Sequence, residues 1–252
     1  MNIKYMKFGN GPKNMVILPG LSYRPVTESA QAVMDAYQIF NDDFTVCLFD
    51  YREDPAEGTT VEDMADDVAE AIEELGLNDI YLYGVSMGGM VSQELVLKYP
   101  DSFKKLALCS TVAKVEDNPK LNGWKKAAQK KDIVLLTELF MRYVYTKEVY
   151  DQSIDIMISL YKNLSDEDLR NVAIRVDAVN GFDVTDRLKE IKLPVFFLGS
   201  KADQVFPYEQ LKVIPDTLGC ESYFYEGYSH AIYDEAPDIK EKIHDFFMEE
   251  KG

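Results

Sequence analysis

The most informative segment of the chain reads Ile80-Tyr-Leu-Tyr-Gly-Val-Ser86-Met-Gly-Gly-Met90. Its apolar start is typical of a buried β-strand, and an apolar helical pattern begins directly after the glycines. Between them lies Gly-x-Ser-x-Gly, the pattern of a nucleophile elbow when it joins a strand to a helix. Glycine at 84 and 88 leaves room where a β-carbon would collide with a neighbouring element. The segment therefore predicts that the Ser86 hydroxyl projects above the end of a strand.

The alternative for this motif is a glycine-rich turn whose serine has no chemical role. A bare Gly-x-Ser-x-Gly arises by chance in roughly one chain of this length in ten. The preceding β-rich run, the additional Gly89 and the apolar helix favour a nucleophile. A serine hydroxyl also needs a base and a carboxylate, so the hypothesis depends on partners elsewhere in the chain.

Two histidines are available as the base, His230 and His244. His244 lies within a predicted amphipathic helix, where an exposed side chain is expected. His230 lies in a loop after the last predicted strand, and Asp203 lies in the loop after the strand before it. Because the carboxyl ends of parallel strands meet at one edge of a sheet, we expect both loops to reach Ser86. The sequence predicts a catalytic triad of Ser86, His230 and Asp203.

A developing oxyanion needs backbone N–H donors that already point at it. The amide of Met87 follows the nucleophile at the start of a helix and is the first candidate. The second is the amide of Leu21, because Pro19-Gly20-Leu21 follows an apolar strand and Gly20 permits close approach. We therefore expect an oxyanion hole made by Leu21 and Met87.

Strands and helices alternate along most of the chain, which predicts parallel strands joined by right-handed crossovers. The predicted strands are 3–8, 15–18, 44–49, the run from Ile80, 105–110, 194–198 and 221–225. Residues 113–182 contain helical patterns only, and their 11 basic and 11 acidic side chains balance within a chain of net charge −17. This predicts an α/β core of residues 1–112 and 183–252 with a separate helical segment, 113–182.

These residues resemble the α/β-hydrolase superfamily over nearly the whole chain. The resemblance implies a mostly parallel central sheet of about seven strands, with helices on both faces and a helical cap inserted at 113–182. Two local patterns depart from the family. Pro19 stands where the oxyanion turn usually has histidine, and Asp50-Tyr51-Arg52 resembles a family loop whose following glycines are missing here.

The composition bears on partners and location. A net charge of −17 disfavours binding to nucleic acid and to anionic membranes. No apolar run is long enough to insert into a membrane, and no signal peptide is evident, so we expect a cytoplasmic protein. The three cysteines are expected to be reduced and buried. Neither a metal site nor an organic cofactor is expected.

The predicted activity is that of a serine hydrolase that forms an acyl-enzyme on Ser86. The aromatic and apolar cap favours a small, fairly apolar acyl substrate, with a carboxylesterase as the first choice. Most cap aromatics are expected to pack the helices together, while a minority line a pocket. The lysines between 120 and 131 are expected to form a solvated face, with attraction of a substrate carboxylate as the alternative. Thioesterase, lactonase, aminopeptidase, carbon–carbon bond hydrolase and menaquinone-pathway lyase chemistry remain open, as does a small-molecule receptor that retains the triad.

Overall fold

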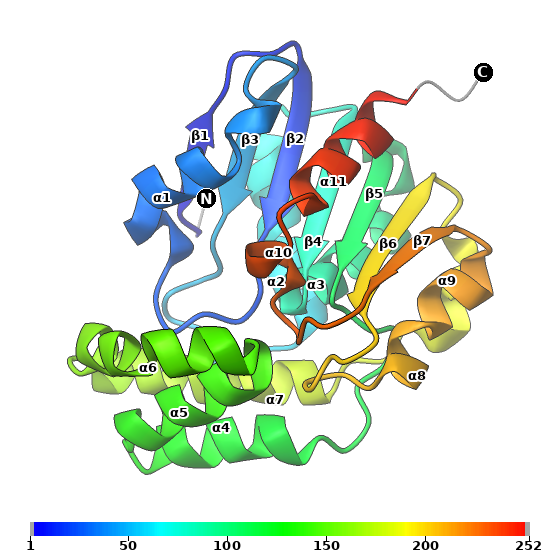
Figure 1. The fold of residues 1–252 in the computed structure, drawn as a ribbon. Helices are drawn as coiled ribbons and strands as arrows, with labels where there is room; N and C mark the ends of the chain where they lie inside the picture. Colours follow the sequence, from blue (N-terminus) through cyan, green and yellow to red (C-terminus); the bar gives the residue numbers. More distant parts are fainter. Residues whose placement is uncertain (1–2, 250–252) are drawn as a thin grey trace.

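The computed structural model of the protein describes residues 3–249, and a seven-stranded sheet lies at its centre (Figure 1). The strands follow the spatial order β1-β3-β2-β4-β5-β6-β7. Their bounds are β1 (Tyr5–Phe8), β2 (Lys13–Leu18), β3 (Phe44–Phe49), β4 (Ile80–Val85), β5 (Phe103–Cys109), β6 (Val195–Ser200) and β7 (Glu221–Tyr225). β1 is antiparallel to β3, and all other neighbours are parallel. The prediction of a mostly parallel sheet of seven strands is confirmed.

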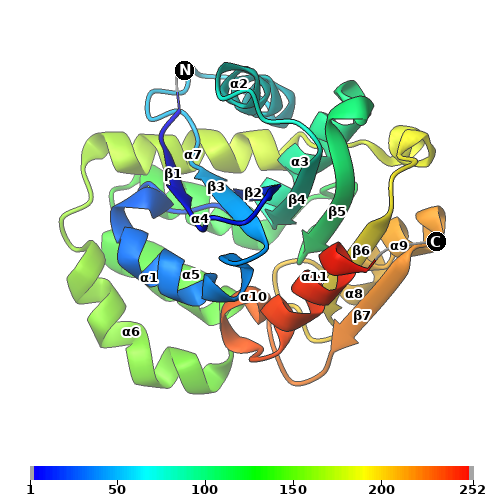
Figure 2. The ribbon, with the colours of Figure 1, turned by 90° about the horizontal axis from the view of Figure 1, so that it is seen from above.

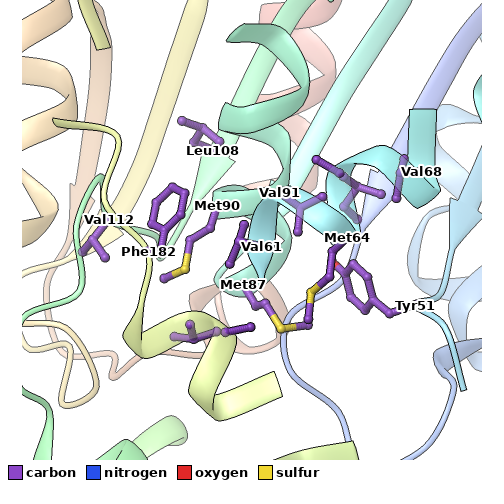
Figure 3. Packing of buried hydrophobic residues seen from close by; sticks show 14 of the residues in the cluster. Tyr51, Val61, Met64, Val68, Met87, Met90, Val91, Leu108, Val112 and Phe182 are labelled. Carbon is purple, nitrogen blue, oxygen red and sulfur yellow. The ribbon is translucent and has the colours of Figure 1, made fainter. Parts of the chain in front are cut away.

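Helices cover both faces of this sheet, because side chains alternate along each buried strand. α2 (Val61–Glu74) and α3 (Met87–Lys98) lie on one face, and α1 (Ala30–Ala36) and α11 (Ile239–Met248) lie on the other (Figure 2). In β2, Val16 belongs to the core under α2 and α3, whereas Ile17 belongs to the core under α11. Figure 3 shows part of the first core, to which Tyr51, Met64 and Met87 belong.

Helices interrupt the alternation between β5 and β6. The inserted helices are α4 (Pro119–Gln129), α5 (Ile133–Val144), α6 (Lys147–Tyr161) and α7 (Asp166–Asn180). They lie together beneath the sheet in Figure 1, at the edge formed by the carboxyl ends of the parallel strands. We call residues 113–182 the insertion.

The two ends of the insertion are paired with each other. Lys114 and Asp183 form an antiparallel bridge, and their side chains form an ion pair of 2.8 Å. Backbone hydrogen bonds from Val115 to Phe182 and from Val184 to Ala113 continue this pairing. The chain therefore enters and leaves the insertion through one short neck.

Three short helices connect β6, β7 and α11: α8 (Tyr208–Leu211) and α9 (Val213–Leu218) lie between β6 and β7, and α10 (Ile232–Glu235) lies between β7 and α11. Within residues 3–249, 3₁₀ helices lie elsewhere in the chain, at Val26–Ser29, Gln38–Phe40, Pro100–Ser102 and Thr185–Glu190. None of the helices within residues 3–249 combines the length and apolar character that crossing a membrane would require.

The cysteines follow the sequence expectation in part. Cys47 and Cys109 are buried in β3 and β5, and burial raises the pKa of the Cys109 thiol to about 12. Its thiol therefore stays protonated and a poor nucleophile near neutral pH. Cys220 is only half-buried, contrary to the expectation, because it lies just before the edge strand β7.

Candidate active site

Ser86 lies in the turn between β4 and α3, with a backbone φ of 51° and ψ of −116°. A serine rarely adopts this conformation, so the surrounding bonds must hold it. The Ser86 amide donates to the carbonyl of Cys109 at 2.8 Å, and the Thr111 hydroxyl donates to the Ser86 carbonyl at 2.8 Å. Both contacts come from the end of β5 or directly after it, so two neighbouring strands fix the turn.

Gly88 shows why the turn needs glycine. A β-carbon at this position would lie 2.1 Å from the carbonyl oxygen of Leu18, a backbone atom at the end of the interior strand β2. The start of α3 can approach the sheet this closely only without a side chain.

We expect Gly88→Ala to lower the free energy of unfolding by about 3 kcal/mol, because the strand and helix must separate. For a chain of this size that corresponds to a melting temperature about 10 °C lower. Gly123→Ala is the matched control: its β-carbon would meet only Leu139 at 3.6 Å in the interior of α4. This control should stabilise the protein by up to about 1 kcal/mol. Equal melting temperatures for Gly88→Ala and the wild type would contradict the close approach.

The three predicted triad residues meet in one hydrogen-bonded chain. His230 Nδ1 lies 2.8 Å from Asp203 Oδ2, and His230 Nε2 lies 2.9 Å from Ser86 Oγ. His230 and Asp203 are buried, whereas Ser86 is half-buried. The carboxylate accepts the Nδ1 proton, which leaves Nε2 as the acceptor for the serine hydroxyl.

Asp203 is oriented by its own loop. Its Oδ1 accepts hydrogen bonds from the backbone amides of Val205 at 2.7 Å and Phe206 at 2.9 Å. These two donors fix the carboxylate plane and leave Oδ2 for the imidazole. The Phe206 ring lies edge-on to His230, with ring centroids 5.5 Å apart.

The loop that carries His230 is held from two sides. Ser110, directly after β5, donates its hydroxyl proton to the His230 carbonyl at 2.7 Å. The Ser229 hydroxyl donates to the Tyr143 carbonyl, and the Ala231 amide donates to the Val144 carbonyl, both at 2.8 Å. Residues on both sides of the imidazole are therefore fixed to the last turn of α5 in the insertion.

The predicted oxyanion turn lies against the serine. A β-carbon on Gly20 would come within 3.3 Å of Ser86 Cβ and 3.9 Å of Ser86 Oγ. Met87 is the first residue of α3, so its amide has no acceptor within the helix. The amide of Leu21 donates to no group within residues 3–249. The two amides named from the sequence thus belong to segments that adjoin Ser86.

The environment of His244 differs from the sequence expectation of an exposed side chain. The His244 side chain is only 19% exposed, because it packs near Phe40 and Phe44 and lies 2.9 Å from Asp43 Oδ2. It is half-buried at the rim of the core under α11 and has no part in the triad. Among the lysines of α4, Lys125 forms an ion pair with Asp177, consistent with a solvated helix face.

Sequence reasoning missed the roles of two residues after β3. Asp50 accepts hydrogen bonds from the amides of Val26 and Thr27, at 2.6 and 3.1 Å, and so caps the first 3₁₀ helix. The Tyr51 hydroxyl donates to the carbonyl of Pro19 at 2.7 Å. The Asp50-Tyr51-Arg52 pattern marked this loop in the sequence. It could not reveal the hydrogen-bond partners of Asp50 and Tyr51, because these lie more than 20 positions earlier in the chain.

Comparison with known families adds the decisive observation. Residues 26–237, most of the chain, match the model of the family described as serine aminopeptidase, S33. The protein belongs to this family. As a member of the S33 family it is an α/β hydrolase, which confirms the resemblance and the fold expected from it.

Relatives of this S33-family chain include two groups of hydrolases. It is 25% identical over 226 residues to "Putative carbamate hydrolase RutD" of Agrobacterium fabrum, covering 80% of this chain and 82% of that protein. It is 24% identical over 174 residues to 3-oxoadipate enol-lactonase 2 of Acinetobacter baylyi, covering 66% of this chain and 64% of that one.

Solved structures show the same fold. The enol-lactonase from Burkholderia xenovorans LB400 superimposes with a TM-score of 0.85 at 18% identity, over 98% of this chain and 96% of that one. An alpha/beta hydrolase from a Medee basin deep-sea metagenome library gives a TM-score of 0.88 at 20% identity, over 99% and 95% of the two chains.

Proposed function

We propose that this protein is a serine hydrolase that cleaves a small, fairly apolar acyl compound through an acyl-enzyme on Ser86. The observation that carries the proposal is the continuous chain from Ser86 Oγ through His230 to Asp203, with distances of 2.9 and 2.8 Å. A buried carboxylate behind the imidazole stabilises the positive charge that forms when the serine gives up its proton.

The reaction follows from this arrangement. His230 Nε2 accepts the hydroxyl proton while Ser86 Oγ bonds to the acyl carbon, and the oxyanion receives hydrogen bonds from the amides of Met87 and Leu21. The bond to the leaving group then breaks, and the imidazolium returns its proton to the departing oxygen or nitrogen. Water enters, and His230 removes its proton as its oxygen bonds to the acyl carbon. Collapse of the second tetrahedral intermediate breaks the bond to Ser86 Oγ, which takes the proton back from the imidazolium, and the acid is released.

An aromatic cluster supports an apolar acyl group. Tyr23, two residues after the oxyanion turn, lies 5.3 Å from Phe140 and 4.8 Å from Tyr161 between ring centroids. Trp124 extends the cluster at 5.2 Å from Phe140. We assign the acyl side of the site to this cluster, because it joins the insertion to the segment beside Ser86.

A lactone is the second candidate substrate. The similarity to enol-lactonases in both sequence and fold favours it. The chemistry is that of ester cleavage, except that the leaving alcohol stays attached to the acyl chain. The same residues would therefore serve both substrates, and the shape of the acyl site would decide between them.

An activity screen tests this proposal. Wild type and Ser86→Ala would be offered p-nitrophenyl acetate, butyrate and octanoate, a thioester, a small lactone, a carbamate ester and an aminoacyl p-nitroanilide. We expect turnover of short esters or the lactone by wild type alone. The proposal would be refuted if the wild type turned over none of these substrates and a fluorophosphonate did not label Ser86. The triad would then have only a binding role.

A further inference from the structure

Arg175 is a buried cation with an unusual set of partners. It lies on α7 of the insertion and is 5% exposed. Its guanidinium donates to the carbonyl of Arg52 at 3.0 Å and to the carbonyl of Ser22 at 3.4 Å. No carboxylate of residues 3–249 lies within 4.0 Å of it. Asp50, Glu53 and Asp168 act on it electrostatically from farther away. Burying a charge that has no carboxylate in direct contact is costly, which points to a role for its contacts.

Tyr51 is the neighbour that links this cation to the active site. The guanidinium carbon of Arg175 lies 6.0 Å from the centre of the Tyr51 ring. The ring is buried, and its hydroxyl donates to the Pro19 carbonyl at 2.7 Å. Burial raises the pKa of Tyr51, so the hydroxyl keeps its proton and remains a donor throughout the neutral range.

The two acceptors of this pair flank the oxyanion turn. Pro19 and Ser22 are the residues on either side of Gly20-Leu21, and each has its carbonyl held by Tyr51 or Arg175. The Leu21 N–H belongs to the peptide unit between Gly20 and Leu21, which lies between the two units whose carbonyls are held. Since peptide units are planar, only a few φ/ψ rotations remain within this short segment, and fixing both of its ends limits how far the Leu21 amide can turn. The turn has proline at 19, so a histidine side chain cannot support it here.

We propose that Tyr51 and Arg175 are positioning residues that aim the Leu21 amide at the oxyanion, an inference that rests on the proposed function of Ser86. In this arrangement, the insertion contributes to the oxyanion hole through α7, just as it contributes to the base loop through α5. Neither side chain needs to touch the substrate.

The surroundings argue against a rival role, in which Arg175 binds a substrate carboxylate. Tyr51, Arg52 and Arg175 line a cleft of about 440 Å³ whose other charged residues are acidic. These residues are Asp54, Asp63, Asp66, Asp67 and Glu57. Five carboxylates around the cleft disfavour an anionic ligand, whereas they do not affect hydrogen bonds to backbone carbonyls.

The test compares Tyr51→Phe, Arg175→Lys, Arg175→Gln and the Tyr51→Phe/Arg175→Lys pair, using a neutral short-chain ester. We expect kcat to fall about 10-fold for Tyr51→Phe and more for Arg175→Gln than for Arg175→Lys, with KM within about twofold of wild type. An alkyl boronic acid forms a tetrahedral adduct on the serine. Its inhibition constant should rise in each variant by the same factor by which kcat/KM falls. The double variant should lose less than the product of its single effects, because both residues hold one turn.

Arg170→Gln is the matched control. Arg170 also lies on α7 and donates to the Pro55 carbonyl at 3.1 Å, but it does not reach the oxyanion turn. Its kcat should stay within about twofold of wild type. An equal loss in Arg170→Gln would mean that α7 had simply loosened, and would overturn the inference.

Other outcomes also overturn it. One such outcome is that the Arg175 variants raise KM without changing kcat, and that the rise in KM is larger for esters that carry a carboxylate. This would make Arg175 a ligand-binding residue. If Tyr51→Phe has the same kinetics as wild type, the inference is refuted, but the proposed function stands as long as the wild type shows turnover that depends on Ser86. If the wild type shows no such turnover, both the inference and the proposed function are refuted. If Arg175→Gln fails to fold, Tyr51→Phe and Arg175→Lys, with melting temperatures measured, decide the matter.

Discussion

Replacing Ser86 with alanine is expected to lower kcat/KM for the preferred ester by about 10⁴-fold or more, because no other hydroxyl occupies the position opposite His230 Nε2. Steady-state kinetics with matched circular dichroism spectra would measure the loss in a folded protein. Ser222→Ala, at an exposed position of β7, is the control and should keep wild-type activity. Retention of more than about a tenth of the activity in Ser86→Ala would exclude Ser86 as the nucleophile.

At position 86, a substitution that abolishes activity is expected to stabilise the folded protein. Ser86 holds a φ of 51° and ψ of −116°, which costs about 1–3 kcal/mol for a residue with a β-carbon. Ser86→Gly removes this strain, although it adds freedom to the unfolded chain. We therefore expect an inactive protein whose free energy of unfolding rises by about 1 kcal/mol, measured by denaturant titration. A less stable Ser86→Gly variant would show that the turn stores no strain.

The second large effect concerns the base. His230→Ala should lower kcat/KM by about 10⁴-fold, since the imidazole takes the proton in both halves of the reaction. His244→Ala should leave kcat/KM within about twofold and lower stability by about 1 kcal/mol, because it loses the contact with Asp43. Kinetics and thermal melting of both variants separate these roles. Similar kinetic losses in the two variants would mean that the base is wrongly assigned.

Sequence patterns predicted the interior strands well because most of them are short apolar runs followed directly by turn residues. The residues proposed for catalysis share this signal: Ser86, Asp203 and His230 each follow a strand, and a parallel sheet brings the ends of its strands to one edge. The order of elements along the chain was therefore enough to place them near one another.

The supporting contacts carry no such signal. Arg175 lies in the middle of a helix and reaches Ser22, 153 positions earlier in the chain. His244 has a helical pattern around it that indicates solvent, but Asp43 lies 201 positions away and covers it. These contacts depend on how helices pack on the sheet, and local patterns do not determine that packing.

The contacts of the insertion give it a part in the site. The last turn of α5 holds Ser229 and Ala231, and α7 holds the carbonyl of Ser22 through Arg175. Loosening either helix should therefore disturb the base or the oxyanion turn before it unfolds the core. This distinguishes the insertion from a cover that only excludes water.

The most direct test of the account is covalent labelling with a fluorophosphonate, followed by mass mapping of the modified peptide. The account predicts one adduct, on Ser86, that forms in the wild type, is absent in Ser86→Ala and forms at least about 100-fold more slowly in His230→Ala. An adduct on another residue, or equal labelling rates with and without the imidazole, would contradict it.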